Sequence, residues 1–285
     1  MPKYLGLYIL NSFGISVHFC FLATPINYSM SIKIATYNLN GVRSSISKGL
    51  LDWVQAAAPD ILCVQEIKSQ ADQVDTAAFA ELGYSSYIFP ATKKGYSGVA
   101  VFSKLKPDSV VLGMDLLHYD FEGRLIRLDF GDWTLINTYF PSGSSGDERQ
   151  DFKMKFLSDF QIYIEKLKQD RPKLVICGDY NICHRAIDIH NPVSNARSSG
   201  FLPEEREWME NFLQSGFTDT FRHLNKEPHN YTWWSFRAGA RSKNLGWRID
   251  YICISDNLND TIVSSRILPA AMHSDHCPMI TELKL

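Results

Sequence analysis

The feature that most constrains this sequence is a series of short apolar runs, each five to eight residues long, that begins just after Met30. Runs of this length that are bounded by turn or polar residues are typical of buried strands. We predict strands over 32–37, 61–65, 98–104, 124–130, 133–140, 174–178, 248–255, 261–268 and 278–285. Gly131 and Asp132 leave room only for a tight turn between the fourth and fifth of these strands.

Amphipathic stretches lie between the runs and predict helices over 48–57, within 148–168 and over 204–214. The longest carries Phe152, Phe156, Phe160, Ile164 and Leu167 at helical spacing, with Asp147 as the expected N-cap. Pro172 should end that helix, and 183–203 reads as a long polar loop. Many strands with few long helices favour an α/β (α+β) fold of two packed sheets flanked by helices, in one domain over 30–285.

Charge and cysteine content exclude several classes of protein. Lys and Arg total 29 against 31 for Asp and Glu, so a protein that coats nucleic acid through bulk positive charge is excluded, whereas a local basic face is not. Six cysteines in 285 residues are too few for a disulfide scaffold, and we expect a reducing, cytoplasmic environment. Cys177, Cys183, His184 and His190 fit no common zinc spacing.

Residues 1–29 are apolar and aromatic, but polar residues and Gly14 interrupt them. No stretch is clean enough for a membrane span, and the cations and cleavage site of a secretory signal are poor. We expect a non-catalytic extension or a misplaced start, with targeting as the alternative, and no membrane association.

Polar side chains stand where several predicted strands begin or end, and they suggest chemistry. They are Asn38, Asn40, Glu66, Asp179, Asn181, Asp275 and His276. Sites in α/β sheets gather beyond strand ends, so these side chains could share one cleft. An oxygen-rich set without thiolate suits Mg²⁺ or Mn²⁺ and phosphoester cleavage. The alternative is that each Asn or Asp only forms a turn.

A second pattern is a basic stretch with tryptophans in or beside it. Residues 237–248 include Arg237, Arg241, Lys243 and Arg248 and no acidic residue, and Trp233, Trp234 and Trp247 accompany them. Cations interleaved with aromatic rings suit a nucleic-acid surface. The alternative is that the tryptophans belong to the core and the arginines to a solvated face.

Seven motifs, in order, carry a resemblance to a known family. They are IKIATYNLNGVR, VQEIKS, GYSGVAVFSK, NTYFPSGSSGDER, CGDYNICH, YTWWSFRAGARSKNLGWRIDY and HSDHCPM. The series resembles that of the exodeoxyribonuclease III / apurinic-apyrimidinic (AP) endonuclease family and covers essentially 30–285. The resemblance implies a four-layer αββα sandwich of two mixed sheets. It also implies Mg²⁺-dependent cleavage of duplex DNA 5′ to abasic sites, with variable 3′-to-5′ exonuclease, 3′-phosphodiesterase and 3′-phosphatase activity.

The resemblance also implies roles for individual residues. The metal site would use Asn38, Glu66, Asp179, Asn181, Asp275 and His276. Asp179 would activate the attacking water and Asn181 would position it. His276, oriented by Asp250, would contact the scissile phosphate, and Tyr139 would face the phosphate or the leaving oxygen. Asn40 stands where some relatives carry Asp, so its role stays open.

DNA contacts follow from the same resemblance. Trp233, Trp247 and Ile249 would form the pocket for an extruded abasic sugar. Phosphates would be held by Arg43, Lys48, Lys93, Lys94, Tyr96, Arg237 and Lys243. The implied partner is double-stranded DNA with abasic sites or 3′ ends, bound by a monomer with Mg²⁺ or Mn²⁺. Two rivals remain at this stage: a phosphoesterase of the same superfamily acting on a lipid or inositol phosphate, and a catalytically silent DNA-binding protein.

Overall fold

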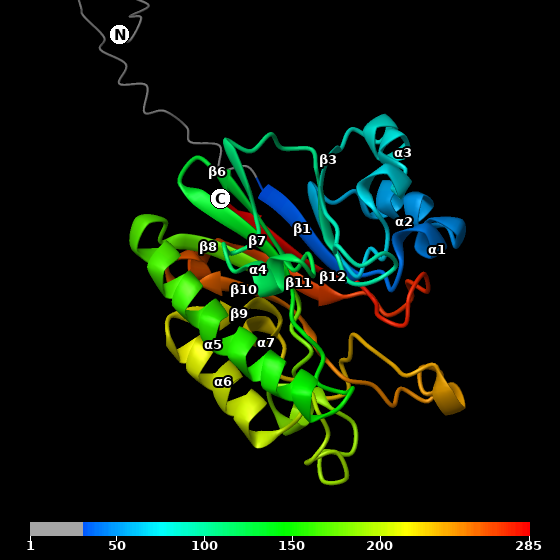
Figure 1. Ribbon diagram of the computed structural model, residues 1–285, viewed down its shortest axis with the longest axis vertical. Coiled ribbons are helices and arrows are strands. Elements are labelled where there is room, and N and C mark those ends of the chain that lie inside the picture. The colour runs from blue at the N-terminus through cyan, green and yellow to red at the C-terminus, as the bar shows by residue number, and fades with distance from the viewer. Residues whose placement is uncertain (1–30) are drawn as a thin grey trace, which may run out of the picture.

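The computed structural model describes residues 31–285 and contains two six-stranded sheets that lie face to face (Figure 1). Sheet A has, in spatial order, β11 (Ile262–Ile267), β12 (Met279–Lys284), β1 (Ser31–Asn38), β2 (Ile61–Gln65), β4 (Val99–Ser103) and β3 (Ser85–Phe89). Sheet B has β5 (Ser109–Leu112), β6 (Leu125–Phe130), β7 (Trp133–Tyr139), β8 (Lys173–Asp179), β10 (Asp250–Ser255) and β9 (Phe217–Asp219). The predicted class of two packed mixed sheets is confirmed.

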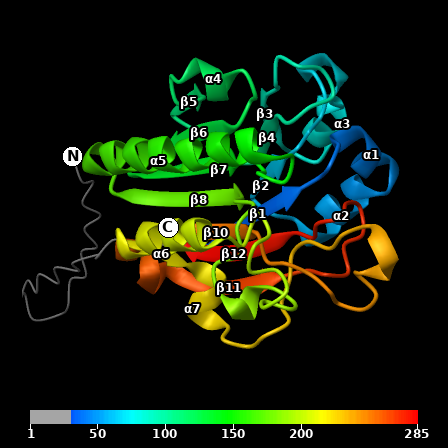
Figure 2. The same cartoon turned by 60° about the horizontal axis from the view of Figure 1, so that its bottom comes forward.

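Helices cover the outer faces of both sheets, which gives four layers (Figure 2). Sheet A is covered by α1 (Val42–Ser47), α2 (Leu50–Ala57) and α3 (Thr76–Glu81). Sheet B is covered by α4 (Leu117–Asp120), α5 (Asp147–Asp170) and α6 (Pro203–Gln214). The short α7 (Thr220–Leu224) contacts β10 and β11, one strand from each sheet. Four 3₁₀ turns complete the described elements: Ala71–Gln73, Ala186–Asp188, Arg237–Gly239 and Asp256–Thr261.

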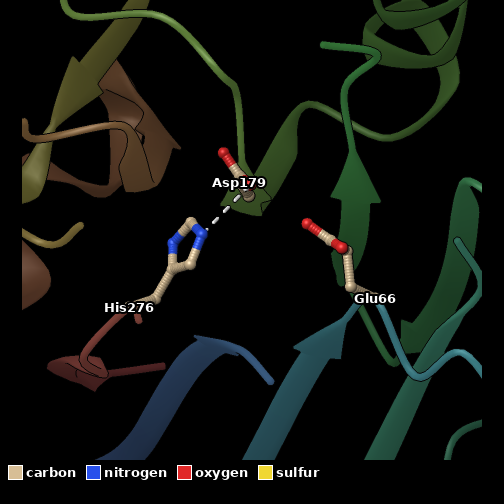
Figure 3. A group of neighbouring side chains, drawn as sticks. All are labelled: Glu66, Asp179 and His276. Atoms are coloured by element: carbon tan, nitrogen blue, oxygen red, sulfur yellow. Dashed lines mark ion pairs between the residues drawn. The ribbon is translucent and has the colours of Figure 1, made fainter. Parts of the chain in front are cut away.

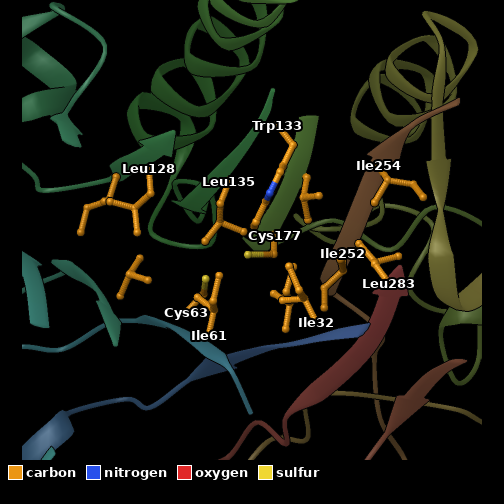
Figure 4. Packing of buried hydrophobic residues seen from close by; sticks show 14 of the residues in the cluster. Ile32, Ile61, Cys63, Leu128, Trp133, Leu135, Cys177, Ile252, Ile254 and Leu283 are labelled. Carbon is orange, nitrogen blue, oxygen red and sulfur yellow. The ribbon is translucent and has the colours of Figure 1, made fainter. Parts of the chain in front are cut away.

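The core between the sheets is apolar and fully buried (Figure 4). Inward side chains of sheet A, such as Ile61 and Cys63, face those of sheet B, such as Leu135 and Cys177. The burial predicted for Cys63, Cys177 and Cys253 is confirmed, since none of them is exposed. Burying a large apolar side chain contributes about 1.5–3 kcal/mol, so this layer holds the two sheets together.

One parallel pair in each sheet decides where the site lies. β1 runs parallel to β2, and β7 runs parallel to β8, whereas every other pairing is antiparallel. The carboxyl ends of both pairs lie at one end of the sandwich, because Asn38, the last residue of β1, donates a hydrogen bond to Asp179, the last residue of β8. β10 begins at this end because Asp250 pairs with Asp179, and β12 begins there because Met279 pairs with Thr36.

Several details differ from the sequence-based prediction. The expected helix over 48–57 begins at Leu50, because Gly49 adopts a left-handed conformation (φ 89°) and separates α1 from α2. Asp147 is the first residue of α5 and not its cap; Gly146 occupies that position. Strands β3, β5 and β9 were not predicted, because β3 and β5 are short and mostly exposed or half-exposed, and β9 has only three residues.

The prediction for residues 1–29 concerns a segment outside the described residues. Within residues 31–285, no helix combines the length and apolar character needed to span a membrane.

Candidate active site between the two sheets

Three titratable side chains from three separate segments converge where the parallel pairs end. One ligand atom from each of Glu66, Asp179 and His276 lies within 4.8 Å of the other two (Figure 3). Glu66 follows β2, Asp179 ends β8, and His276 precedes β12. Two carboxylates and an imidazole at this separation could hold one metal ion.

Left-handed backbone conformations turn the chain sharply at these strand ends. Asn40, Glu66 and Asn181 have φ values of 48°, 50° and 51°. Asparagine visits this region readily, but glutamate does not, and such a residue costs about 1–3 kcal/mol. The segment is held in place because Gly41 N–H donates to the Glu66 carbonyl at 2.8 Å and Ile67 N–H donates to the Gly98 carbonyl at 3.1 Å.

Asn38 links the two sheets at the site. Its Nδ2 donates to Glu66 Oε1 and to Asp179 Oδ2, both at 2.8 Å. Beneath it, Gln65 Nε2 donates across the sheets to Asn137 Oδ1 at 2.7 Å. The Asn38–Asp179 and Gln65–Asn137 hydrogen bonds are buried and cross from one sheet to the other, so they fix the spacing of the sheets directly under the site.

His276 is held by one carboxylate and faces another. Its Nδ1 lies 2.9 Å from Asp250 Oδ2, and its Nε2 lies 4.0 Å from Asp179 Oδ2. Burial opposes a charged ring, but the carboxylates of Asp250 and Asp179 outweigh burial and raise the pKa of His276 to about 10. The ring is therefore an imidazolium at neutral pH in the protein as it stands.

Burial and neighbouring carboxylates oppose the negative charge of Asp179. It is 1% exposed, and burial together with the negative charge of Asp250 raises its pKa to about 7, although His276 acts in the other direction. The second oxygen of Asp250, Oδ1, is buried and has no hydrogen-bond partner. Among the described residues, this end of the sandwich thus holds negative charge that its own hydrogen bonds do not fully compensate.

Tyr139, at the end of β7, lines a cavity that also has Glu66, Asp179 and His276 in its wall. The guanidinium of Arg124 lies 4.9 Å from its ring centroid, and Arg124 donates to the Tyr139 carbonyl at 2.8 Å. Burial and the charges of Glu66 and Asp179 raise the pKa of Tyr139 well above its usual value. Its hydroxyl therefore stays protonated and is available as a donor.

Part of the cavity wall beside the charged groups is apolar. The cavity has a volume of about 350 Å³ and includes Trp233, Trp247 and Ile249 in its wall. The two indole rings meet edge to face at 5.8 Å, and Trp233 Nε1 donates to Asp275 Oδ2 at 3.0 Å. Trp234, in contrast, is buried outside this cavity, where its indole N–H donates to Asn244.

Asp275 and Asn40 form the outer rim of the acidic cluster. Asn40 Nδ2 donates to Asp275 Oδ1 at 2.9 Å. Lys68 lies beside them, with its Nζ 2.7 Å from Glu66 Oε2. Burial opposes ionisation of Glu66, but Lys68 and Asn38 lower its pKa below the usual range. Asp275 also has a lowered pKa: burial opposes this, and His276 and the hydrogen bond from Asn40 bring it about.

All six basic residues predicted to contact DNA are exposed: Arg43, Lys48, Lys93, Lys94, Arg237 and Lys243. Tyr96 is half-buried, and its hydroxyl accepts hydrogen bonds from Arg124 at 3.4 Å and Arg149 at 3.2 Å. Tyr96 is thereby linked to Tyr139 through the single side chain of Arg124.

Two basic residues of 237–248 point inward, so neither the predicted nucleic-acid surface nor its alternative, a solvated face, describes them. Arg248 is fully buried and pairs with Asp188 at 2.7 Å. Arg241 donates to the backbone carbonyls of Pro269, Ala271, Ser274 and His276. Both arginines satisfy internal acceptors, which composition alone cannot distinguish from a phosphate-binding surface.

Sequence reasoning missed several residues at the site. The cavity wall also includes Ser142, Ser144, Ser199 and Gly200. A Cβ added to Gly200 would lie 2.9 Å from the Trp247 ring, so a glycine is required for this wall to close on the indole. A weak signal existed in the sequence, since Ser142 and Ser144 belong to the NTYFPSGSSGDER motif and Lys68 belongs to VQEIKS, but none marked Gly200.

The family model described as the Endonuclease/Exonuclease/phosphatase family matches residues 35–276. An exodeoxyribonuclease of Bacillus subtilis (strain 168) is 41% identical over 250 residues, which cover 87% of this chain and 98% of that protein. A DNA-(apurinic or apyrimidinic site) endonuclease of Dictyostelium discoideum is 39% identical over 252 residues, which cover 87% of this chain and 69% of that protein.

Solved structures with the same fold agree with these matches. An AP endonuclease from Archaeoglobus fulgidus superposes with a TM-score of 0.81 at 32% identity, covering 89% of this chain and 100% of that one. The 3′ phosphatase NExo from Neisseria, bound to a product DNA hairpin, superposes with a TM-score of 0.82 at 28% identity. The match covers 88% of this chain and 99% of that one.

Proposed function

This chain belongs to the endonuclease/exonuclease/phosphatase family, in its exodeoxyribonuclease III / AP endonuclease branch, and on that premise we propose that it is an abasic-site nuclease. It is a hydrolase of DNA phosphodiester bonds. The specific reaction we propose is Mg²⁺-dependent cleavage 5′ to an abasic site in duplex DNA, as a step of base excision repair. The catalytic domain is 30–285 and acts as a monomer.

The observation that carries this proposal is the position of the cluster of Glu66, Asp179 and His276 against an apolar pocket. Hydrolysis of a phosphodiester needs charged groups around the phosphorus. Binding of an extruded abasic sugar needs a small apolar surface beside those groups. Both features share one cavity of about 350 Å³, which includes Trp233 and Trp247.

The donor set fits a hard divalent cation. Four carboxylates, Glu66, Asp179, Asp250 and Asp275, face two cationic groups, Lys68 and His276, and Asp250 Oδ1 has no hydrogen-bond partner. Oxygen ligands without thiolate suit Mg²⁺, and Mn²⁺ can substitute. We assign Glu66 as the main carboxylate ligand, supported by Asn38, Asp179, Asn181 and Asp275. When bound, the cation would stabilise negative charge that develops on the phosphate oxygens.

Asp179 is the proposed base for the attacking water. Its Oδ1 accepts from the Asn181 N–H at 2.8 Å and its Oδ2 accepts from Asn38, so its orientation is fixed by two donors. The side-chain Nδ2 of Asn181 donates to Asp179 Oδ2 at 3.3 Å and to the Phe140 carbonyl at 3.0 Å, so its Oδ1 is the atom that would accept a hydrogen bond from a water beside Asp179. A carboxylate with a raised pKa takes a proton from water more readily than an ordinary aspartate does.

His276 is the proposed donor to the scissile phosphate. Asp250 accepts from Nδ1 and so orients the ring, and the raised pKa keeps a proton on Nε2. A protonated imidazole has no free lone pair, so His276 serves the phosphate and not the cation in this state. Tyr139 would donate from its protonated hydroxyl to the phosphate or the leaving 3′ oxygen.

The pocket of Trp233, Trp247 and Ile249 would receive the extruded abasic sugar. Extrusion is easiest where the base is already missing, which supplies part of the selectivity. Arg43, Lys48, Lys93, Lys94, Tyr96, Arg237 and Lys243 would hold flanking phosphates, in contacts that are independent of sequence and sensitive to salt. The 3′-to-5′ exonuclease and 3′-phosphodiesterase activities would use the same groups at a 3′ end.

An end-labelled duplex with one tetrahydrofuran abasic analogue tests the proposal. With Mg²⁺ we expect one cut immediately 5′ to the analogue, followed by a resection ladder if 3′-to-5′ activity is present. EDTA should abolish the cut, and a matched duplex without the analogue should not be incised. No cut with Mg²⁺, or hydrolysis of inositol phosphate or sphingomyelin instead, would contradict it.

A further inference from the structure

Lys68 forms an ion pair with Glu66, the carboxylate that the proposed function assigns to the metal. Its Nζ lies 2.7 Å from Glu66 Oε2, and it donates a hydrogen bond to Asn40 Oδ1. These two oxygens follow neighbouring strands, β2 and β1, at the mouth of the site. The ammonium group therefore lies between oxygens of the type that a hard cation binds.

The backbone is shaped to put Lys68 there. Glu66 and Lys68 both have left-handed φ values, 50° and 49°, with the buried Ile67 between them. The Lys68 N–H donates to the Ser97 carbonyl at 2.9 Å, which fixes the turn. Neither residue type favours this conformation, and strain of this kind gathers at functional sites. The Lys68 side chain is 33% exposed, and a pair at such a position adds little to stability by itself.

An ammonium group on Glu66 must oppose the binding of a second cation to the same carboxylate. Like charges about 4 Å apart repel strongly at the effective dielectric of a protein surface, and a divalent ion doubles the effect. Both the repulsion and the loss of the Lys68–Glu66 contact would weaken metal binding.

We propose that Lys68 is an internal counter-cation that competes with the divalent metal for Glu66 and sets the metal affinity of the DNA-free protein. The inference rests on the proposed function, since it takes Glu66 as a metal ligand. The role explains how the charge of Glu66 is neutralised without metal: Lys68 pairs with Glu66 until a cation replaces it. A lysine that only stiffened the site would have the opposite effect on removal, because a looser site binds metal less tightly.

The test is Mn²⁺ binding to the full chain without DNA, measured by isothermal titration calorimetry and by the electron paramagnetic resonance signal of free Mn²⁺. Lys68→Met should lower the Mn²⁺ dissociation constant by about tenfold or more, because the competing charge is gone. Lys68→Gln, which can still donate to Asn40, should tighten binding similarly. Lys68→Arg should stay close to wild type.

Lys104→Met is the matched control. Lys104 is exposed, and its N–H pairs with the carbonyl of Asp60, which precedes β2, so it lies at the opposite end of the strand that Glu66 follows. This variant should leave Mn²⁺ affinity unchanged. Unchanged or weaker binding in both Lys68→Met and Lys68→Gln would overturn the inference.

Glu66→Gln separates this result from failure of the proposed function. If wild type shows Mn²⁺ binding that Glu66→Gln removes, the site assignment stands and the Lys68 variants decide the inference alone. If wild type and Lys68→Met show no Mn²⁺ binding that depends on Glu66, the metal assignment itself fails and the inference falls with it.

Discussion

Two buried carboxylates at opposite ends of sheet B have opposite electrostatic surroundings. Asp129, near the end of β6, accepts hydrogen bonds from Arg127 at 2.7 Å, Ser109 at 2.7 Å and Thr134 at 2.7 Å. Burial opposes its ionisation, but these donors lower its pKa to about 2. Asp179, at the end of β8, has a pKa raised to about 7 by burial and by Asp250.

The difference separates a carboxylate that holds the fold together from one that is held in place for chemistry. The guanidinium groups of Arg127 and Arg171 stabilise Asp129 as an anion. Asp179 also accepts hydrogen bonds from Asn38 and Asn181, but burial and the Asp250 carboxylate outweigh them and raise its pKa. A divalent cation is the partner that would complete it, and proximity to such an ion favours the ionised form. Natural proteins accept this kind of unfavourable environment at functional sites and compensate for it elsewhere.

The largest expected effect is on catalysis. Asp179→Asn should lower single-turnover incision of an abasic duplex by more than about 10²-fold, because the proposed base is lost. Asp129→Asn should keep incision within about twofold of wild type. DNA affinity, measured by gel shift, should change little in either variant. Near wild-type turnover in Asp179→Asn would remove the distinction between the two carboxylates.

Loss of the His276 ring, which faces Asp179, should have the next largest effect on incision. His276→Ala should also lower incision by more than about 10²-fold, because the proposed phosphate donor is lost. Asp250→Asn keeps the ring and weakens only its orientation, so a loss of about 10–100-fold is expected. The two rates are measured under single turnover at saturating enzyme. Equal rates for Asp250→Asn and wild type would show that the 2.9 Å contact has no part in catalysis.

Bound metal should stabilise the folded protein through the site at the Asp179 end of sheet B. This stabilisation should not depend on Asp129 at the other end. At a hundredfold excess of Mg²⁺ over its dissociation constant, wild type should gain about 2.7 kcal/mol in the free energy of unfolding. Asp129→Asn should unfold at a lower temperature but gain the same amount. Glu66→Gln should lose most of the gain. Thermal unfolding with Mg²⁺ and with EDTA measures all three, and an equal gain in Glu66→Gln would place the ion elsewhere.

The smallest effect concerns stability at low pH. The folded pKa of Asp129 is about 2, below its usual value of 3.8, so its contribution is present above pH 3.8 and is lost as pH falls towards 2. Asp179 has the opposite sign, because a raised pKa favours the protonated form and its contribution is lost as pH rises through about 7. Urea unfolding of wild type and Asp129→Asn at pH 5 and pH 3 tests the first statement. The two proteins should converge at the lower pH, and parallel curves would contradict it.

The sequence predicted the fold better than it predicted the hydrogen bonds and ion pairs of the site. Apolar runs gave nine of the strands because burial controls both the run length and the strand, whereas β3 and β5 are too exposed to leave that pattern. Polar residues at strand ends indicated a shared cleft because the parallel pairs end together.

Contacts that depend on side-chain direction could not be predicted in this way. Lys68 turns back onto Glu66 only because both residues adopt left-handed conformations, and nothing in the letters EIK indicates this. Arg241 and Arg248 turn inward because backbone carbonyls and Asp188 are close in space, although they are far away in sequence. The basic composition of 237–248 does not indicate whether its arginines bind internal carbonyl groups or DNA phosphates.

Anomalous diffraction from a crystal grown with Mn²⁺ tests the central claim most directly. The account predicts a single strong peak within coordination distance of a Glu66 carboxylate oxygen, in the cavity shared with Asp179 and His276. A peak bound elsewhere on the protein, with the Glu66 carboxylate uncoordinated, would contradict it.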